Sequence, residues 1–400
     1  MSDSLSATLK RFATWLDSHG ETSWDHQSYF AGGYGAWAKG LYYRHKLLGT
    51  AAVSPMIVSE AVFPSARRLF HHRTRFPIAD AHYAMGFAYL YQADRDDQYL
   101  QRAIHFLEEL KKSRSPGYDD YCWGYPFDWV TRNGTIAAHT PFITTLPYVY
   151  EAFHQVYTLD ARPEWRAVME SIVRHATTVI RDFQTSPTAS SCTYGPHDEK
   201  GGVINASAYR AFLLTHASQF FDDPRLWAIA ERNLNFVLEN QQPDGSWPYA
   251  VDGVRDFVDH FHTCFVMKAL AKIHSITGHR RTLDALGRGV TYYLNNLFDT
   301  DGLPKPFSVA PRLTVYRREL YDCAESINLC LLLRDRFPSM GEKLDVVVRG
   351  ILADWIQPSG AFRARQLRFG WDNTPMHRWA QSQMFRSLAL CRLALHQREQ

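Results

Sequence analysis

The sequence lacks the features that mark membrane, exported or nucleic-acid-binding proteins. Its apolar block at residues 329–333 is far shorter than the roughly 18 residues of a membrane span. Residues 1–16 have no signal-peptide core. The 44 Lys and Arg residues nearly balance 41 Asp and Glu residues, for a net charge of +3, whereas a dedicated nucleic-acid binder carries a concentrated basic excess. We therefore expect a cytoplasmic protein with no transmembrane segment and no nucleic-acid partner.

Paired cysteines are lacking too. The six cysteines are scattered and none belongs to a Cys-x-x-Cys pair, so we expect no disulfide framework, no metal site and no cofactor.

Aromatic residues are abundant instead, since 11 Trp, 21 Tyr and 24 Phe make up 14% of the chain. The hydrophobic fraction of 46% and the charged fraction of 21% are typical of a globular protein.

Segments that are apolar on nearly all sides recur with a period of about 60 residues, which indicates a repeated helix hairpin. Their predicted starts are Ile78, Thr140, Ile204, Val258, Leu320 and His377. A more polar helix lies between successive starts, and these helices are predicted at 98–112, 164–183, 224–240, 281–298 and 341–356. The first set should be buried, and the second should expose one face to solvent.

Six such hairpins can close into a ring, which makes the predicted fold an all-α, α/α toroid: an (α/α)6 barrel of six inner and six outer helices. An open superhelical array is the rival architecture. We expect five to six hairpin repeats over residues 76–400, with residues 1–75 supplying helices that complete or cap the ring. Because no Pro/Gly/Ser-rich linker or charge block interrupts the chain, we assign a single domain to residues 1–400.

The loops that enter the inner helices are long and rich in aromatic residues. All inner helices of a toroid begin at one end, so these loops should wall a mouth there. Aromatic rings can stack on the C–H faces of sugars, which predicts a carbohydrate-binding surface; alternatively, the rings plug the top of the barrel. The candidate substrate-binding residues of these loops are Trp123, Tyr125, Asp128, Trp129, His197, Trp247, Tyr249 and Trp371.

The first turns of the inner helices place polar groups at the same mouth. Asp259 and His262 share a helix face, so the acid can fix the tautomer of the imidazole and raise its basicity; the alternative is a histidine hydrogen-bonded in a helix interface. Arg378 is a candidate carboxylate clamp, or else forms a salt bridge to a neighbouring helix. The other candidates are Asn205, Tyr321, Glu325 and Gln381 near the inner-helix starts and Tyr194 on a loop.

Four ordered segments resemble bacterial polysaccharide-biosynthesis proteins of the Vps type. They are WGYPFDW at 123–129, QPDGSWPY at 242–249, VDHFHT at 258–263 and RWAQ at 378–381. The resemblance implies an α/α toroid encoded with exopolysaccharide or capsule genes. The element Gln-x-x-Asp-Gly-Ser-Trp at 241–247 also resembles the repeat of triterpene cyclases, which share the toroid architecture. The Asp-x-Asp-Asp acid element of those cyclases is missing here, which argues against cyclase activity.

The predicted reaction is proton abstraction at C5 of a uronic acid, giving epimerisation or β-elimination. We expect Arg378 and Asn205 to neutralise the substrate carboxylate, His262 to act as the base, and Tyr321 or Tyr194 to act as the acid. The substrate would be an acidic oligosaccharide or polysaccharide, either free or linked to a lipid. Two alternatives remain: a glycoside hydrolase that uses two of Asp128, Asp259 and Glu325, and a non-catalytic glycan-binding or scaffold subunit.

Overall fold

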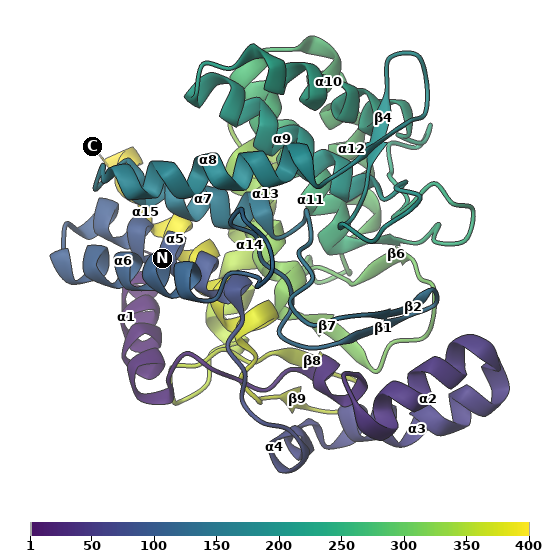
Figure 1. The fold of residues 1–400 in the computed structure, drawn as a ribbon. Coiled ribbons are helices and arrows are strands. Elements are labelled where there is room, and N and C mark those ends of the chain that lie inside the picture. Colours follow the sequence, from purple (N-terminus) through teal and green to yellow (C-terminus); the bar gives the residue numbers. More distant parts are fainter. Residues whose placement is uncertain (1, 400) are drawn as a thin grey trace.

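The computed structural model describes residues 2–399, and helices dominate it (Figure 1). Each inner helix packs against the next one, and the last packs against the first, so the ring closes. The predicted (α/α)6 barrel is therefore confirmed, and the open array is wrong. The inner helices are α5 (Pro77–Asp94), α7 (Leu146–Tyr157), α9 (Ile204–Phe220), α11 (His260–Thr277), α13 (Leu320–Leu333) and α15 (Ser382–Glu399).

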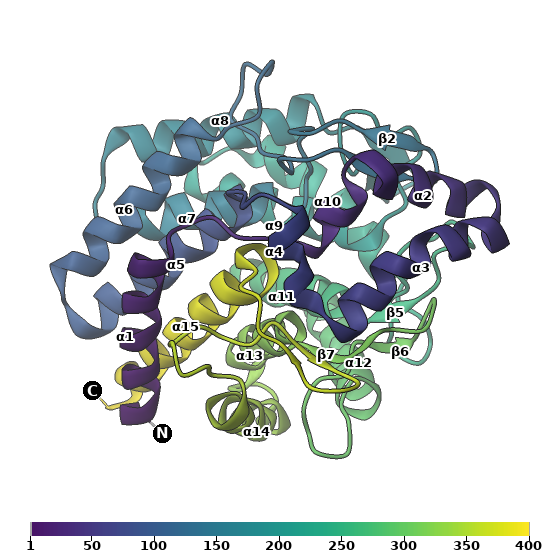
Figure 2. The same cartoon turned by 90° about the horizontal axis from the view of Figure 1, so that it is seen from below.

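The outer helices surround this ring, as the view along the barrel in Figure 2 shows. The sixth outer position is taken by the first helix of the chain, α1, which packs against α15 and α14. Its residues Leu5, Leu9, Phe12 and Leu16 are buried at helical spacing. The outer helices are α1 (Ser2–His19), α6 (Asp97–Lys112), α8 (Pro163–Thr178), α10 (Pro224–Glu239), α12 (Arg280–Asn296) and α14 (Pro338–Asp354).

Local signals explain most helix boundaries. The side chains of Asp96 and Asp223 accept hydrogen bonds from the first-turn amides of α6 and α10, as N-cap residues do. A proline occupies the first turn of α8, α10 and α14, where its missing N–H costs nothing. Gly278 ends α11 in the left-handed conformation at a φ of 69°, which glycine adopts without strain.

Two predicted boundaries are wrong. The inner helix expected from Thr140 begins at Leu146, because residues 140–145 form turns ahead of Pro147. The outer helix expected over 164–183 ends at Thr178, because Asp182–Gln184 is instead a strand. In addition, the chain forms a π-helical turn, His377–Gln381, before α15 begins.

Nine short strands form small antiparallel sheets, and all of them lie in the loops that enter the inner helices. They pair as β1 with β2, β3 with β4, β5 with β6, and β7 with β8 and β9. The strands therefore stiffen the mouth end of the barrel. Their bounds are β1 Trp129–Thr131, β2 Gly134–Ile136, β3 Asp182–Gln184, β4 Ser190–Cys192, β5 Val258–Asp259, β6 Phe307–Val309, β7 Tyr316–Glu319, β8 Arg365–Leu367 and β9 Trp371–Asp372.

Residues 20–76 cross the mouth end of the barrel between α1 and α5 (Figure 2). This N-terminal segment contains a 3-10 turn, His26–Phe30, the hairpin of α2 (Gly33–Arg44) and α3 (Lys46–Val62), a second 3-10 turn, Pro64–Ala66, and α4 (Arg67–Phe70). The hairpin has a small apolar cluster of its own, made of Tyr29, Ala38 and Met56, apart from the main core. The assignment of one domain to residues 1–400 stays a prediction.

Candidate functional site

Aromatic side chains from successive loops and helix starts form a nearly continuous circuit at the mouth, which we call the rim. On one side, the ring of Phe142 lies 5.5 Å from Tyr125 and 5.4 Å from Tyr194, between ring centroids. On the other side, Tyr249 lies 4.6 Å from the His262 ring. The rim consists of Tyr125, Phe142, Tyr194, Tyr249, Phe261, His262, Tyr321 and Trp379.

The circuit continues from His262 towards α15. Phe261 lies 4.3 Å from His262 and 5.1 Å from Tyr321. The rings of Tyr321 and Trp379 are stacked, with an interplanar angle of 4°. The Arg378 guanidinium lies 4.0 Å from the Trp379 ring and 4.9 Å from the Tyr125 ring, which joins the two ends of the circuit. Several rim rings are only partly buried, so they present aromatic faces around the barrel axis.

His262 and Asp259 form a hydrogen-bonded pair at this rim. Asp259 is the N-cap of α11, where one oxygen accepts the His262 backbone N–H at 3.0 Å. Its other oxygen lies 2.6 Å from His262 Nδ1. Asp259 is buried, whereas the His262 side chain keeps an exposed fraction of 19%. The carboxylate therefore holds the proton on Nδ1 and leaves Nε2 with its lone pair as a base.

Tyrosines around this pair keep their protons at neutral pH. Burial raises the pKa of Tyr249 to about 12, and burial also raises the pKa of Tyr321 and of Tyr194 well above the ordinary value. The Tyr194 hydroxyl accepts a hydrogen bond from Thr144 at 3.2 Å. A protonated phenol can donate a hydrogen bond to an oxygen that becomes negative during a reaction.

A second group of polar residues, which we call the axial cluster, lies deeper among the inner helices. Lys268 of α11 forms an ion pair with Glu325 of α13, and its ammonium donates to the Tyr148 hydroxyl at 3.1 Å. The hydroxyls of Tyr148 and Tyr209 are 2.6 Å apart. Burial lowers the pKa of Lys268 to about 8, although Glu325 opposes the shift. The axial cluster consists of Tyr148, Tyr209, Lys268 and Glu325.

Asp322 and Asn205 are among the buried side chains of the inner helices that have no hydrogen-bond partner within the described residues. Both carboxylate oxygens of Asp322 and both polar atoms of the Asn205 amide are in this state, although each residue is at most 2% exposed. Burial, reinforced by Glu319 and Asp259, raises the pKa of Asp322 well above its ordinary value. Unpaired polar groups at this depth are costly, and groups kept at that cost are candidates for binding a ligand.

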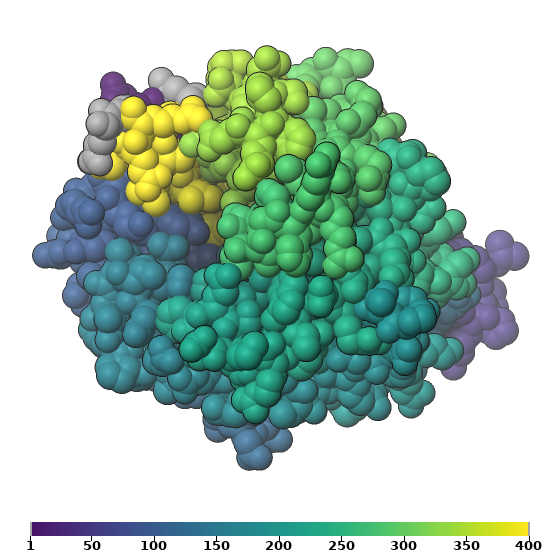
Figure 3. Space-filling model, turned by 90° about the horizontal axis from the view of Figure 1, so that it is seen from above, coloured from purple at the N-terminus to yellow at the C-terminus, as the bar shows by residue number. Residues whose placement is uncertain are grey.

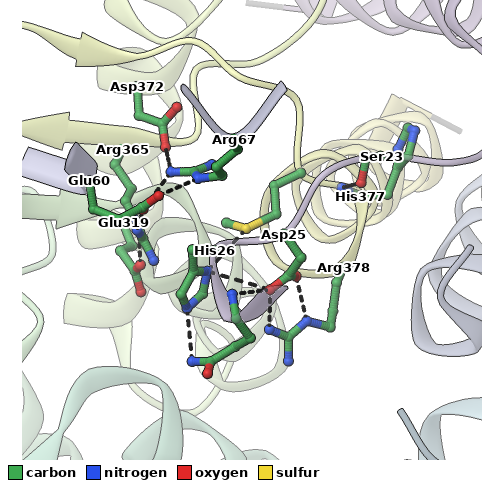
Figure 4. Close-up of polar contacts among 12 residues, drawn as sticks. Ser23, Asp25, His26, Glu60, Arg67, Glu319, Arg365, Asp372, His377 and Arg378 are labelled. Atoms are coloured by element: carbon green, nitrogen blue, oxygen red, sulfur yellow. Dashed lines mark hydrogen bonds and ion pairs between the residues drawn. The ribbon is translucent and has the colours of Figure 1, made fainter. Parts of the chain in front are cut away.

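Arg378 contacts the N-terminal segment (Figure 4). Its guanidinium donates two hydrogen bonds to Asp25, at 2.7 and 2.8 Å, and both side chains are at most 1% exposed. The expected role as a free carboxylate clamp is therefore wrong, because Asp25 already satisfies the charge. The sequence could not reveal this pairing, since the two residues are 353 positions apart.

Further ion pairs fix the N-terminal segment to the C-terminal loops (Figure 4). Arg67 of α4 donates to Glu60 at 2.6 and 2.7 Å and to Asp372 at 2.5 Å. Arg365 bridges Glu60, at 3.1 Å, and Glu319, at 2.5 Å. All five side chains are buried, so residues 20–76 are firmly attached over the mouth.

Three predicted substrate-binding residues are buried structural residues. The indole N–H of Trp123 donates at 2.9 Å to the backbone carbonyl of Leu110, and that of Trp247 donates at 2.9 Å to the backbone carbonyl of Val237. Each carbonyl belongs to the outer helix that precedes the tryptophan. The Gln381 side chain bonds both the N–H and the carbonyl of Phe362. These predictions are wrong, because each side chain is at most 3% exposed and anchors a loop.

The other loop candidates differ in position. Trp129 joins the rim, 5.4 Å from Tyr125. Trp371 is partly buried and packs edge-on against Trp355 at the end of α14, and its role as a sugar platform stays a prediction. Asp128 is exposed and accepts a hydrogen bond from the Ala138 N–H, which shapes the β1–β2 hairpin. His197 is exposed on a turn.

Sequence reasoning missed several residues of the site. Lys268 is one of two lysines in α11, a helix that is otherwise apolar on nearly all sides, and this pattern could have marked it. Asp322 could have been singled out in the same way within α13. Asp25 carried no signal, because nothing in its local sequence indicates that it reaches Arg378.

Metal binding finds no support in this geometry. Within residues 2–399, no group of three or more His, Cys, Asp or Glu side chains is arranged to hold a metal ion. His260, the residue after Asp259, is buried, with its ring nitrogens at 3.0 Å from the Leu297 carbonyl and 2.8 Å from the Tyr293 hydroxyl.

Comparison with known proteins relates the chain to enzymes that act on carbohydrates. No family model and no curated protein matches it. The cellobiose 2-epimerase of Bacillus thermoamylovorans superposes with a TM-score of 0.64 at 12% identity, covering 82% of this chain and 90% of that chain. The α-1,6-mannanase of Salegentibacter, in complex with α-1,6-mannotriose, gives 0.56 at 12%, covering 81% and 90%. A polysaccharide lyase gives 0.54 at 10%, covering 86% and 96%.

Proposed function

We propose that this toroid is a carbohydrate-active enzyme that removes a proton from a sugar carbon next to a carbonyl group. The observation that carries the proposal is the His262–Asp259 pair, which is partly exposed within a rim of aromatic rings. His262 Nε2 would take the proton, while Asp259 stabilises the imidazolium that forms. The aromatic rings would hold the sugar by its C–H faces.

The tyrosines supply the second half of the reaction. Proton loss next to a carbonyl places negative charge on the carbonyl oxygen, and a protonated phenol stabilises that charge by donating a hydrogen bond. Tyr249, beside His262, and Tyr321 have raised pKa values because of burial, so each carries a proton to donate. Return of a proton to the opposite face gives epimerisation, and loss of a leaving group at the next carbon gives β-elimination.

The substrate class follows from the charges at the rim. A uronate would need a free cation for its carboxylate, but Arg378 is neutralised by Asp25. An uncharged carbonyl, such as the open-chain aldehyde of a reducing sugar, fits this rim better than C5 of a uronate. Solved structures of this fold include a sugar 2-epimerase and a polysaccharide lyase, which supports proton-transfer chemistry without identifying the sugar. A setting in exopolysaccharide or capsule synthesis remains part of the proposal.

The direct test is exchange of the substrate proton with solvent. The purified protein is incubated in D2O with a panel of reducing oligosaccharides and uronate oligosaccharides, and deuterium at each carbon is read by NMR. We expect exchange next to the carbonyl, loss of exchange in His262→Ala, and unchanged exchange in His197→Ala, whose histidine is exposed on a turn. Exchange that persists in His262→Ala, or its absence across the whole panel, would overturn the proposal and favour the scaffold alternative.

Glycoside hydrolysis is the second candidate, and Asp322 is the observation that favours it. Burial raises the pKa of the Asp322 carboxyl well above its ordinary value, a shift towards the protonated form that a general acid needs. Glu325, on the same helix, would be the second carboxylate. Cleavage of oligosaccharides without deuterium exchange, abolished by Asp322→Asn and retained in His262→Ala, would establish this alternative.

A further inference from the structure

Exposed apolar side chains are concentrated in the N-terminal segment. Leu47, at the start of α3, is 88% exposed, and Val62, at its end, is 73% exposed. Within the described residues, most of the large apolar side chains that are exposed belong to this segment. They are Tyr34, Trp37, Tyr43, Leu47, Leu48, Ile57, Val58, Val62, Phe63, Leu69 and Phe70. We call this set the apolar surface; a patch of this size is uncommon on a protein with no partner.

The accessible charges along the chain segment that forms the apolar surface have one sign. Between residues 33 and 73 the acidic residue is Glu60, which is buried against Arg67 and Arg365. The charged side chains that are accessible there are all basic: Lys39, Arg44, Lys46, Arg68 and Arg73. A surface that combines apolar, aromatic and basic side chains is typical of elements that lie in the interface of an anionic bilayer.

The shape of the segment fits binding along a membrane, not through it. Among the described residues no single helix is long and apolar enough to cross a bilayer. The apolar run that continues from α3 into residues 64–70 is bent by 111°. The α2–α3 hairpin protrudes beyond the edge of the barrel when the molecule is seen from the opposite end (Figure 3). It can therefore enter a headgroup layer without moving the barrel.

The loops at the mouth end add further exposed apolar side chains. Apart from Leu332 at the end of α13, the remaining exposed large apolar side chains are on loops or strands that precede inner helices: Val251, Val254, Val309, Leu313 and Phe369. Both signs of charge accompany them, with exposed arginines at Arg132, Arg312, Arg317 and Arg368 and exposed acids at Asp128, Asp252, Asp256 and Asp301. Arg312 also lowers the pKa of Lys39, though burial is the larger cause, which places that loop close to α2.

We propose that the apolar surface docks the protein on an anionic lipid bilayer, with the mouth end of the barrel facing the membrane. Charge complementarity selects this occupant, since lipid phosphates neutralise the basic residues while acyl chains cover the apolar ones. A second copy bound through the same surface would bring like charges together. This inference does not depend on the proposed function, although it would bring a lipid-linked glycan to the rim.

The test is co-sedimentation of the full chain with vesicles of phosphatidylcholine alone and with vesicles that also contain phosphatidylglycerol. We expect binding to the anionic vesicles that weakens as salt rises. Leu47→Ser with Leu48→Ser should weaken this binding about tenfold or more, because apolar contact is lost. Arg44→Glu with Lys46→Glu should weaken it at least about tenfold. All four side chains are exposed, and circular dichroism checks that the variants fold.

Matched controls come from the rest of the molecule. Leu332→Ser removes an exposed leucine at the end of α13, and Arg280→Glu reverses a charge whose side chain is 92% exposed on α12. Both should bind like the unaltered protein. No binding to anionic vesicles, or binding that is insensitive to both double variants, would overturn the inference. A dimer in light scattering that Leu47→Ser with Leu48→Ser converts to monomer, without vesicle binding, would assign the surface to a second copy.

Discussion

His262 and Arg378 both lie at the rim, and each is bonded to an aspartate, yet their surroundings differ. His262 bonds Asp259, three residues earlier in the chain, and keeps part of its side chain exposed. Arg378 bonds Asp25, 353 positions away, and is fully buried. The first pair has a free nitrogen for chemistry, whereas the second pair holds the N-terminal segment in place. The same level of the barrel thus holds a partly exposed imidazole on one side and a buried ion pair on the other.

The largest expected effect comes from breaking the reactive pair. His262→Ala should lower turnover about 10²–10⁴-fold, because the base acts in the chemical step. The free energy of unfolding should fall by about 1–3 kcal/mol, because the buried Asp259 carboxylate keeps its bond to the backbone N–H of residue 262 but loses its bond to the imidazole. Steady-state kinetics and urea unfolding measure the two quantities. A variant that unfolds at a much lower urea concentration would indicate that His262 has a structural role.

Breaking the structural pair should affect stability. Asp25→Asn leaves a buried arginine without its countercharge, which should cost about 3–5 kcal/mol of unfolding free energy. Chemical denaturation measures the change. The control is Asp17→Asn, which breaks the pair of Arg102 with an aspartate that is 65% exposed and should cost less than about 1 kcal/mol. Equal costs for the two variants would contradict the view that burial makes the Asp25 pair important.

The axial cluster extends the comparison to a pair deeper in the barrel. Burial lowers the pKa of Lys268 to about 8 in the folded protein, from 10.5 in the unfolded chain. Between these two pH values the unfolded chain binds more protons than the folded protein. The contribution of Lys268 to the free energy of unfolding therefore rises with pH over this range. Relative to Lys268→Met with Glu325→Gln, the unaltered protein should gain up to about 3 kcal/mol from pH 8 to 10.5. Denaturation of both proteins across this range tests it; parallel curves would mean that burial does not perturb the lysine.

The smallest effects are expected for two tryptophans, Trp123, which anchors a loop, and Trp129, which lies at the mouth. Trp123→Phe should cost about 1–2 kcal/mol of stability, because the buried indole loses its bond to Leu110, while affinity for saccharides stays unchanged. Trp129→Ala should weaken saccharide binding up to about tenfold at little cost in stability, because Trp129 lies at the rim. Intrinsic fluorescence titration measures the saccharide affinity, and thermal unfolding measures the stability. A loss of affinity in Trp123→Phe would contradict its assignment as an anchor.

Much of the fold could be predicted from the sequence, because its signals are local and repeated. The inner-helix starts predicted near Ile204 and Leu320 agree with the first residues of α9 and α13, since all-round apolar segments there follow polar loops. The start near Thr140 was misplaced, because turns ahead of Pro147 share the composition of the helix they precede. Asp259 and His262 pair as their spacing of three residues predicted, although Asp259 is extended and caps α11 instead of lying on its face.

The sequence by itself determined the hairpin repeat, the closed barrel it builds, and the His262–Asp259 pair, because periodicity and spacing are properties of neighbouring residues. Only the tertiary structure decided which aromatic residues face the mouth. Trp247 and Tyr249 are two residues apart, yet one anchors a loop beneath the surface and the other lies against His262. Tertiary structure also decided that Asp25 neutralises Arg378, because contacts across 353 positions depend on how the ring closes and leave no mark in local sequence.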